Sequence, residues 1–535
     1  MVGLSLTTYA QKNVKITWGP DFELPKKHYE LGFIGDSKSG YIDISHQRAK
    51  SIILQKFSPS LKLTGQNEIP VNNLPKGYMI EALWNMNYKN YLFYSTWSKA
   101  DKTERLYAQE INVDKGNFEG SPKELLNSTE KLSGTLVMTG RVSFGGWGGS
   151  YNTADKWSFY RSADSSKLLI EYRLKPKEKK DAINKDLIGL FVYDKSLNQI
   201  WGEQVEMPYT EKMMDNEDYQ VDKNGNVYIL AKVYGSDAKK RDKNDYHYEV
   251  LMYSKGSKKP NISSFKFADK TVVDIALNED KNGRMICSGF YSKNNKGTDG
   301  AFFLAFDEES KTMKNIKKGF YEFPTDVIKQ FESAKSKKKM EKKESKGEDQ
   351  EVSNLEFRNQ RIDDDGSITL FGEQYVLIIY YTYDSKGHVT EHRKYYYDDI
   401  YVTKIGPDGE LKWVKKIPKA QVGSSPYGMG YHLQYDGQNS YLFFVDNIKN
   451  LNLKPDEAPA VHMNGMGGVL MCVKLDADGK TSKSSIFDFR EEKMNVIVKD
   501  FSNVTNKITI GRARKLKRGL QFNFSEGKIL QLSVE

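Results

Sequence analysis

Short segments in which apolar and polar residues alternate recur along the whole chain, separated by turns rich in Asp, Asn and Gly. Residues 400–418 are the clearest example, because two alternating runs flank the sequence Gly-Pro-Asp-Gly at 406–409. Alternation at period two is typical of a β-strand with one buried face, and Pro-Asp-Gly is a turn sequence. This segment is therefore predicted to form a β-hairpin.

Two kinds of predicted hairpin alternate along the chain. The first kind recurs at 53–69, 190–208, 302–323 and 469–487, with a weaker copy at 106–118; the second, built on turns such as Asp-Lys-Asn-Gly, lies at 219–230, 276–289, 360–372 and 433–445. One hairpin of each kind makes a four-stranded unit of about 50–60 residues, which is the period of a β-propeller blade. Units begin near residues 30, 85, 157, 218, 272, 357 and 431.

The predicted fold is therefore all-β, a β-propeller of four-stranded antiparallel blades. Seven blades is the preferred count and eight the alternative, with the last strands joining the N-terminal segment to complete one blade. Two stacked β-sandwiches would also give many short strands, but one period across the chain favours the propeller. We expect residues 12–535 to form this single domain.

Two insertions interrupt the period. Residues 333–354 include a Lys-rich stretch with no apolar periodicity, which predicts a mobile loop. Residues 373–399 contain two Tyr-rich runs around a turn and are predicted to form a long hairpin that projects from its blade. Tyr residues are enriched at protein interfaces, so the candidate contact residues here are Tyr380, Tyr381, Tyr383, Tyr395 and Tyr396.

The repeats Asp-Lys-Asn-Gly-Asn-Val-Tyr-Ile-Leu (222–230) and Gly-Pro-Asp-Gly-Glu-Leu-Lys-Trp (406–413) resemble strand–turn–strand repeats of exported bacterial β-propellers of unassigned function. The resemblance covers most of the chain and implies a fold rather than an activity. Residues 1–11 resemble the end of a secretory signal peptide, although they lack a basic region and their apolar region is short. An ordinary strand is the alternative. We expect export to the periplasm or the outer cell surface.

The net charge of +10 is concentrated in two segments, Lys335–Lys346 and Arg512–Arg518, which each contribute +5. The remainder is balanced, so no nucleic-acid-binding surface is indicated. No apolar run approaches the roughly 18 residues of a membrane-spanning helix. The basic residues Arg512, Arg514, Lys515, Lys517 and Arg518 are predicted to form a charged turn that either contacts an anionic partner or is simply solvated.

Motifs with specific chemistry are few. Cys287 and Cys472 lie in apolar, strand-like contexts and are predicted to be buried thiols, with a disulfide as the alternative. His388 and His392 are four residues apart on a predicted strand, about 13 Å from each other, which is too far for a shared metal. The Asp-rich turns at 222 and 363 lack the ligand spacing of a calcium loop, so we expect β-turns there. Trp147, set among glycines, is a candidate contact for a glycan or a partner, or else a packing loop.

The sequence therefore predicts a non-catalytic interaction or scaffold module of the cell envelope, or an accessory part of a secretion or surface-assembly machine, with no cofactor or metal. An envelope protein is the expected partner. The alternative is a carbohydrate-binding protein or carbohydrate-acting enzyme that uses the central funnel. An acid–base enzyme stays open as well, because propeller sites assemble from distant loops.

Overall fold

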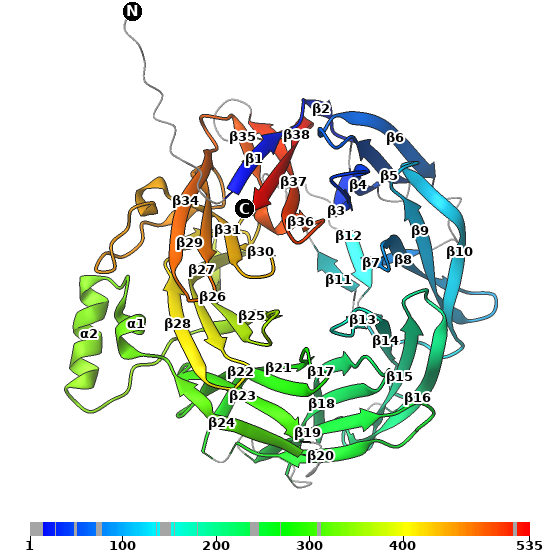
Figure 1. Cartoon of the computed structure of the whole chain (residues 1–535), viewed down its shortest axis with the longest axis horizontal. Helices are drawn as coiled ribbons and strands as arrows, with labels where there is room; N and C mark the ends of the chain where they lie inside the picture. Colours follow the sequence, from blue (N-terminus) through cyan, green and yellow to red (C-terminus); the bar gives the residue numbers. More distant parts are fainter. Residues whose placement is uncertain are drawn as a thin grey trace, which may run out of the picture.

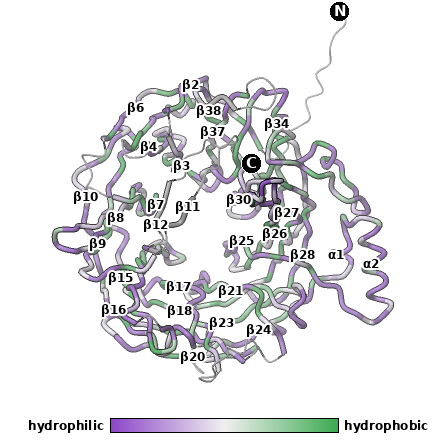
Figure 2. Tube along the Cα trace, turned by 180° about the vertical axis from the view of Figure 1, so that it is seen from behind, coloured by the Kyte–Doolittle hydropathy of each residue, from purple (hydrophilic) through white to green (hydrophobic). Residues whose placement is uncertain are grey.

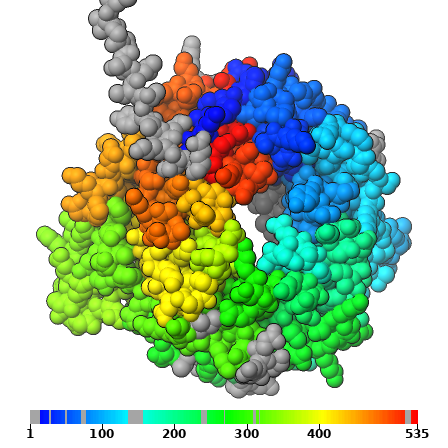
Figure 3. All heavy atoms as spheres, in the orientation of Figure 1, coloured from blue at the N-terminus to red at the C-terminus, as the bar shows by residue number. Residues whose placement is uncertain are grey.

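The chain forms a ring of β-sheets around a central opening (Figures 1 and 3). The computed structural model describes residues 14–535 apart from 27, 48–50, 71–77, 135, 140–150, 155, 179, 236–244, 268, 308–311, 517–521 and 535. The predicted leader at 1–11 lies outside the described residues.

In the described part of the chain, seven sheets built on four antiparallel strands follow one another; six have only these strands, and one has two short additional strands. The first three blades contain β3 (His28–Asp36), β4 (Gly40–Gln47), β5 (Ser51–Phe57), β6 (Leu63–Pro70); β7 (Met79–Met86), β8 (Lys89–Ser98), β9 (Thr103–Asn112), β10 (Asn117–Ser128); and β13 (Ser158–Arg161), β14 (Lys167–Arg173), β15 (Lys185–Asp194), β16 (Gln199–Thr210). The fourth and fifth contain β17 (Met214–Val221), β18 (Val227–Tyr234), β19 (Tyr246–Tyr253), β20 (Asn261–Phe265); and β21 (Thr271–Glu279), β22 (Met285–Ser292), β23 (Gly300–Asp307), β24 (Thr312–Glu322). The sixth and seventh contain β25 (Leu355–Ile362), β26 (Ile368–Tyr383), β27 (Val389–Ile405), β28 (Leu411–Ile417); and β30 (His432–Tyr435), β31 (Ser440–Asp446), β33 (Val469–Leu475), β34 (Thr481–Asp488).

A closing sheet combines both ends of the described chain. Its order is β1 (Val14–Trp18), β38 (Phe522–Val534), β37 (Ile508–Leu516) and β35 (Met494–Val496), while β2 (Phe22–Glu23) pairs with β38 and β36 (Ser502–Asn503) with β37. The register joins Val14 to Val534. The predicted propeller is thus confirmed, including the joining of the last strands to the N-terminal segment. Counted as a blade, this sheet brings the ring to eight.

The first strand of each blade borders the central opening and the fourth lies at the rim (Figure 1). Short additional strands are β11 (Leu136–Thr139) and β12 (Tyr151–Ala154), which form a separate pair, and β29 (Gln421–Gly423) and β32 (His462–Met463), which extend the sixth sheet. The apolar core lies between blades. Val192 of the third blade and Ile229 of the fourth, for example, share one buried cluster. Burying each sheet against its neighbours stabilises the ring.

Asp residues close the turns between the first and second strands of several blades. The Asp222 carboxylate accepts hydrogen bonds from the backbone N–H groups of Asn224 (2.9 Å) and Asn226 (2.8 Å). In the next blade, the Asp280 carboxylate accepts in the same way from Asn282 and Arg284 (both 2.9 Å). These carboxylates satisfy the turn backbone, as expected of Asp in turns. The predicted turn role is confirmed at Asp222.

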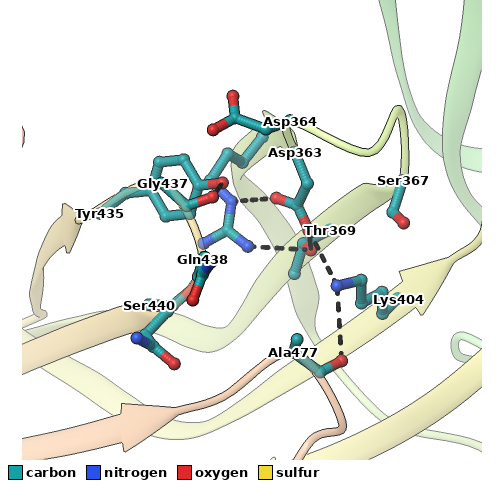
Figure 4. A network of polar contacts seen from close by, with 12 residues as sticks. Asp363, Asp364, Ser367, Thr369, Lys404, Tyr435, Gly437, Gln438, Ser440 and Ala477 are labelled. Atoms are coloured by element: carbon teal, nitrogen blue, oxygen red, sulfur yellow. Dashed lines mark hydrogen bonds and ion pairs between the residues drawn. The ribbon is translucent and has the colours of Figure 1, made fainter.

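The predicted β-turn is also confirmed at Asp363, where the Gly366 N–H donates to the Asp363 carbonyl at 3.0 Å, but the Asp363 side chain has a different role (Figure 4). Its carboxylate contacts the Arg361 guanidinium and lies 3.0 Å from the Lys404 Nζ, and all three side chains are largely buried. Arg361 also contacts the Ser440 hydroxyl, and Lys404 donates to the Ala477 carbonyl at 3.4 Å. Asp363 therefore holds an ionic network that joins the sixth blade to the seventh.

The Lys-rich insertion is helical, which corrects the predicted mobile loop at 333–354. α1 (Thr325–Lys329) and α2 (Ala334–Glu344) lie outside the ring, and α2 is mostly hydrophilic (Figures 1 and 2). The Ser333 hydroxyl caps α2 by accepting from the Ser336 N–H at 3.1 Å. Met340 packs against the core between the fifth and sixth blades. Lys is a good helix former, and the cap and this apolar contact stabilise the helix further.

Both cysteines are buried and free, as predicted. Burial raises the pKa of the Cys287 thiol and of the Cys472 thiol, because a thiolate would be poorly solvated there. They act as small apolar core residues.

Candidate functional site

The predicted hairpin of the sixth blade is the most exposed apolar feature of the described surface. β26 has 16 residues and β27 has 17, about twice the length of the blade's other two strands. Their register continues without interruption from Tyr375↔Tyr397 to Tyr383↔Val389. Successive residues from Leu377 to Tyr383 are all exposed. Because neighbouring residues of a strand point to opposite faces, exposure of every residue means that both faces of this ribbon are free.

The two faces of the ribbon differ in polarity. One carries Leu377, Ile379, Tyr381 and Tyr383, cross-paired with Tyr395, Arg393, Glu391 and Val389. Its charges are paired internally, since Arg393 Nε donates to Glu391 at 2.7 Å and the Tyr381 hydroxyl donates to Glu391 at 3.2 Å. The other face is more polar; there the Tyr380 ring stacks on His392 with centroids 5.0 Å apart.

The edge of β26 that does not pair with β27 is also free along the ribbon. β25 pairs with β26 only as far as Gln374, and the Tyr375 N–H donates to the Asn354 carbonyl at 2.9 Å. Beyond this point no described strand pairs with this edge of β26. The edge sequence Val376–Tyr383 contains no charged residue. Native proteins usually protect free edges with charges or Pro, so an uncharged, apolar edge is suited to pairing with another strand.

The structure brings the five predicted tyrosines together on this ribbon, but it places the other candidates elsewhere. Arg512 and Arg514 are only 4 % and 7 % exposed, which corrects the expectation that they form a solvated or partner-contacting turn. Their strand, β37, lies inside the closing sheet, where Arg512 contacts Asp43 of the first blade. Lys515 is on the surface and pairs with Asp21 at 2.6 Å. Trp147, Lys517 and Arg518 lie outside the described residues.

Sequence reasoning missed a cluster of charged and aromatic residues beside the central opening. Glu373 of β26 is buried and lies 3.0 Å from the Lys419 Nζ and 3.1 Å from the Arg358 Nε. The Arg358 guanidinium lies over the Tyr375 ring, 5.1 Å from its centroid. On the other side, the Lys499 Nζ lies 4.3 Å from the centroid of the Tyr397 ring. This axial cluster is the base of the projecting ribbon.

Carboxylates line the neighbouring inner strands. Burial raises the pKa of Asp218 to about 6 and also raises the pKa of Asp274. Both are used structurally: Asp218 accepts from the Leu277 N–H (2.8 Å) and Asp274 from the Phe357 N–H (3.2 Å), each on the next inner strand. These hydrogen bonds link adjacent blades. Among the described residues, no three His, Cys, Asp or Glu side chains are placed to hold a metal ion.

A sequence signal for these inner strands exists. Residues 214–221, Met-Asp-Asn-Glu-Asp-Tyr-Gln-Val, contain an extended run of polar residues in place of apolar alternation. In a propeller such a strand borders the axis, where water enters. The signal locates the axial wall but does not tell which charges meet there.

No protein-family model matches the chain, and the curated proteins include no similar sequence. Solved structures share its fold. The polysaccharide lyase Uly1 is 10 % identical, with a TM-score of 0.38, over 97 % of this chain and 99 % of the lyase. The WD40 domain of SCAP from fission yeast is 10 % identical (TM-score 0.33; 96 % and 98 % covered). The propeller domain of the Trilobed protease from Pyrococcus furiosus is 9 % identical (TM-score 0.34; 87 % and 97 % covered). Neighbours this distant and this varied assign no activity.

None of the described helices is long and apolar enough to cross a membrane.

Proposed function

We propose that this protein is a non-catalytic docking scaffold and that the β26–β27 ribbon is its contact with a protein partner. The observation that carries the proposal is the free, uncharged edge Val376–Tyr383, which includes the exposed residues Ile379, Tyr381 (55 %) and Tyr383 (73 %). The partner segment we propose is an extended, apolar stretch of another protein, which adds to β26 as a further strand.

Strand addition suits both the backbone and the side chains of this edge. The unpaired N–H and C=O groups of β26 supply hydrogen bonds, and alternate side chains supply specificity. On the face of the ribbon that carries Ile379, Tyr381 and Tyr383, contact with a partner would bury a large apolar area with little loss of side-chain entropy. A charged partner segment would find no opposite charge along this edge, so an apolar one fits best.

The compartment is part of the same proposal. The resemblance to exported bacterial propellers and the leader-like sequence of residues 1–11 both favour the cell envelope, where an accessory role in secretion or surface assembly would use such a scaffold.

The test places a photo-crosslinking amino acid at Tyr381 in the full chain, expressed in its native cells. Tyr88, which is 97 % exposed on the β7–β8 turn, is the matched control position. We expect a partner to crosslink from position 381 and not from position 88, and the crosslink to map to an extended apolar segment. Ile379→Lys, which places a charge on the same face, should abolish it.

Two results would refute the proposal: the same proteins captured from both positions, or crosslinking from position 381 that survives Ile379→Lys. A crosslink that maps to β26 of a second copy of this chain would replace the hetero-partner by self-association. Unchanged thermal unfolding of Ile379→Lys provides the folding control, since Ile379 is exposed and belongs to none of the buried core clusters.

A further inference from the structure

Lys499 occupies an unusual position in the closing sheet. It lies in a one-turn 3-10 helix, η3 (Val498–Asp500), which interrupts the inner edge of that sheet between β35 and β36. η3 packs against β3, β31 and β37, so the turn is held from three sides. The Lys499 residue as a whole is exposed, but its ammonium makes a part-buried contact with Tyr397 in the axial cluster of the sixth blade.

The cations of the axial cluster are not equally paired with carboxylates. Glu373 is paired with both Lys419 and Arg358, and Glu356 is paired with Arg358 at 2.9 Å. Among the described residues, no carboxylate lies within ion-pair distance of Lys499, whose ammonium contacts only the Tyr397 hydroxyl, at 3.2 Å, and the Tyr397 ring. Lys499 is therefore the cation of this cluster that, among the described residues, has no carboxylate at ion-pair distance.

The position of the ammonium is fixed by its surroundings. Tyr397 is buried, so the ring beneath Lys499 does not move freely. Gly430 has a positive φ of 82°, and a Cβ at that position would lie 2.7 Å from the Lys499 Cε. The glycine thus leaves the space that the lysine stem occupies. Partial burial of the ammonium lowers the pKa of Lys499 to about 8; the nearby charge of Glu373 opposes this lowering, and Arg358 and Lys419 add to it.

A part-buried ammonium that is held beside other cations without a directly paired carboxylate is less stable than a fully solvated one. Such an arrangement is stabilised when an anion completes it, since hydrogen bonds between an ammonium or guanidinium and an oxyanion are among the strongest in proteins. The neighbouring Tyr431, whose hydroxyl donates to Asn359 at 2.9 Å, adds a half-buried aromatic wall.

We propose that Lys499, with Arg358 beside it, binds the carboxylate or phosphate group of a small ligand that enters the central opening. This site is separate from the docking ribbon and goes beyond the proposed scaffold function. Lys499 supplies the unpaired charge, Tyr397 holds it in place, and Arg358 adds positive potential without leaving its own carboxylate partners.

Isothermal titration of the full chain tests this proposal with three probes: galacturonate, inorganic phosphate and the neutral sugar galactose. We expect saturable binding of one or both anions and none of galactose. Galacturonate binding alone would identify a sugar acid as the ligand class, and phosphate binding alone a phosphorylated one. Loss of one charge-assisted contact in Lys499→Gln should weaken binding about ten- to hundred-fold.

Two variants control for folding and for general charge. Lys474→Gln removes another lysine that lies over a Tyr ring, 5.4 Å from the centroid of Tyr441, and should leave affinity unchanged. Lys499→Arg keeps the charge and should retain binding within a few-fold. The proposal is overturned by absence of saturable anion binding to the wild-type protein, or by equal loss of affinity in Lys499→Gln and Lys474→Gln.

Discussion

Arg512 is the residue on which we expect closure of the ring to depend most. It lies on β37 of the closing sheet, and its guanidinium contacts Asp43 on β4, Ser45 (3.3 Å) and the Glu30 carboxylate on β3 (3.4 Å). Arg512, Asp43 and Glu30 have side chains at most 2 % exposed. β37 and β4, which meet here, are separated by more than 460 residues of chain.

Replacing Arg512 by Met keeps much of the side-chain volume but leaves two buried carboxylates without their cation. Breaking a buried ion pair in this way costs about 3–5 kcal/mol. An unfolding entropy of about 2.1 cal/mol/K per residue gives roughly 1.1 kcal/mol/K for 535 residues. The variant should therefore unfold about 3–5 °C below the wild-type protein if the ring unfolds as one unit.

Lys515→Met, three positions along the same strand, is the matched control. Lys515 pairs with Asp21 (2.6 Å) and Glu526 (3.1 Å), but these carboxylates are about half exposed. Exposed ion pairs contribute at most about 1 kcal/mol. The thermal unfolding midpoint of Lys515→Met should therefore lie at most about 1 °C below that of the wild-type protein. Differential scanning calorimetry measures both variants, and hydrogen exchange should show faster exchange in β3 and β4 for Arg512→Met alone. Equal midpoints for the two variants would refute the reasoning.

Two further predictions concern buried groups. Burial lowers the pKa of His432 to about 4, and its Nε2 lies 2.7 Å from the Asn503 Oδ1. As the pH falls from 6.5 to 4, this histidine is therefore protonated in the unfolded chain before it is protonated in the folded protein. The free energy of unfolding falls by up to about 3 kcal/mol over that window. His432→Gln should flatten this part of the pH profile of urea midpoints, and an unchanged profile would contradict the assignment. Cys287 and Cys472, which are 0 % and 1 % exposed, should react with an aromatic disulfide reagent only after unfolding, giving two thiols per chain in denaturant; rapid reaction of the native protein would show that a blade opens.

Local sequence signals account for most of the fold. Turn residues such as Asp222 act within a few residues of themselves, so the chain segment alone specifies the turn and the register of its hairpin. The projecting ribbon was predictable for the same reason, because its alternation and its central turn are contiguous. The α2 helix was not, since its segment lacks an apolar stripe. The contacts that hold it include the Ser333 cap, the packing of Met340 on the core between the fifth and sixth blades, and the Lys329–Glu344 ion pair at 2.6 Å.

The candidate sites depend on contacts that no local pattern records. Arg512 and Arg514 form part of a basic run that is typical of a solvated turn, and nothing near them in the sequence indicates that Asp43 and Glu30 would lie opposite. Lys499 and Arg358 are more than 100 residues apart and reach one place only because the ring brings the closing sheet beside the sixth blade. Charge pairing across a closed ring is a property of the topology, and sequence periodicity does not determine it.

The docking ribbon and the anion site share one structural element, and this decides how the two proposals must be separated. Tyr375 and Tyr397 are the first cross-strand pair of the ribbon, with ring centroids 4.9 Å apart, and they are also the aromatic part of the axial cluster. A deletion of the whole hairpin would disturb both sites. Ile379 lies four residues beyond Tyr375, about 13 Å along the strand, so Ile379→Lys should abolish partner crosslinking while anion affinity persists. Lys499→Gln should have the reverse effect. If either variant abolished both activities, the ribbon and the axial cluster would form a single site, and the two proposals would have to be replaced by one.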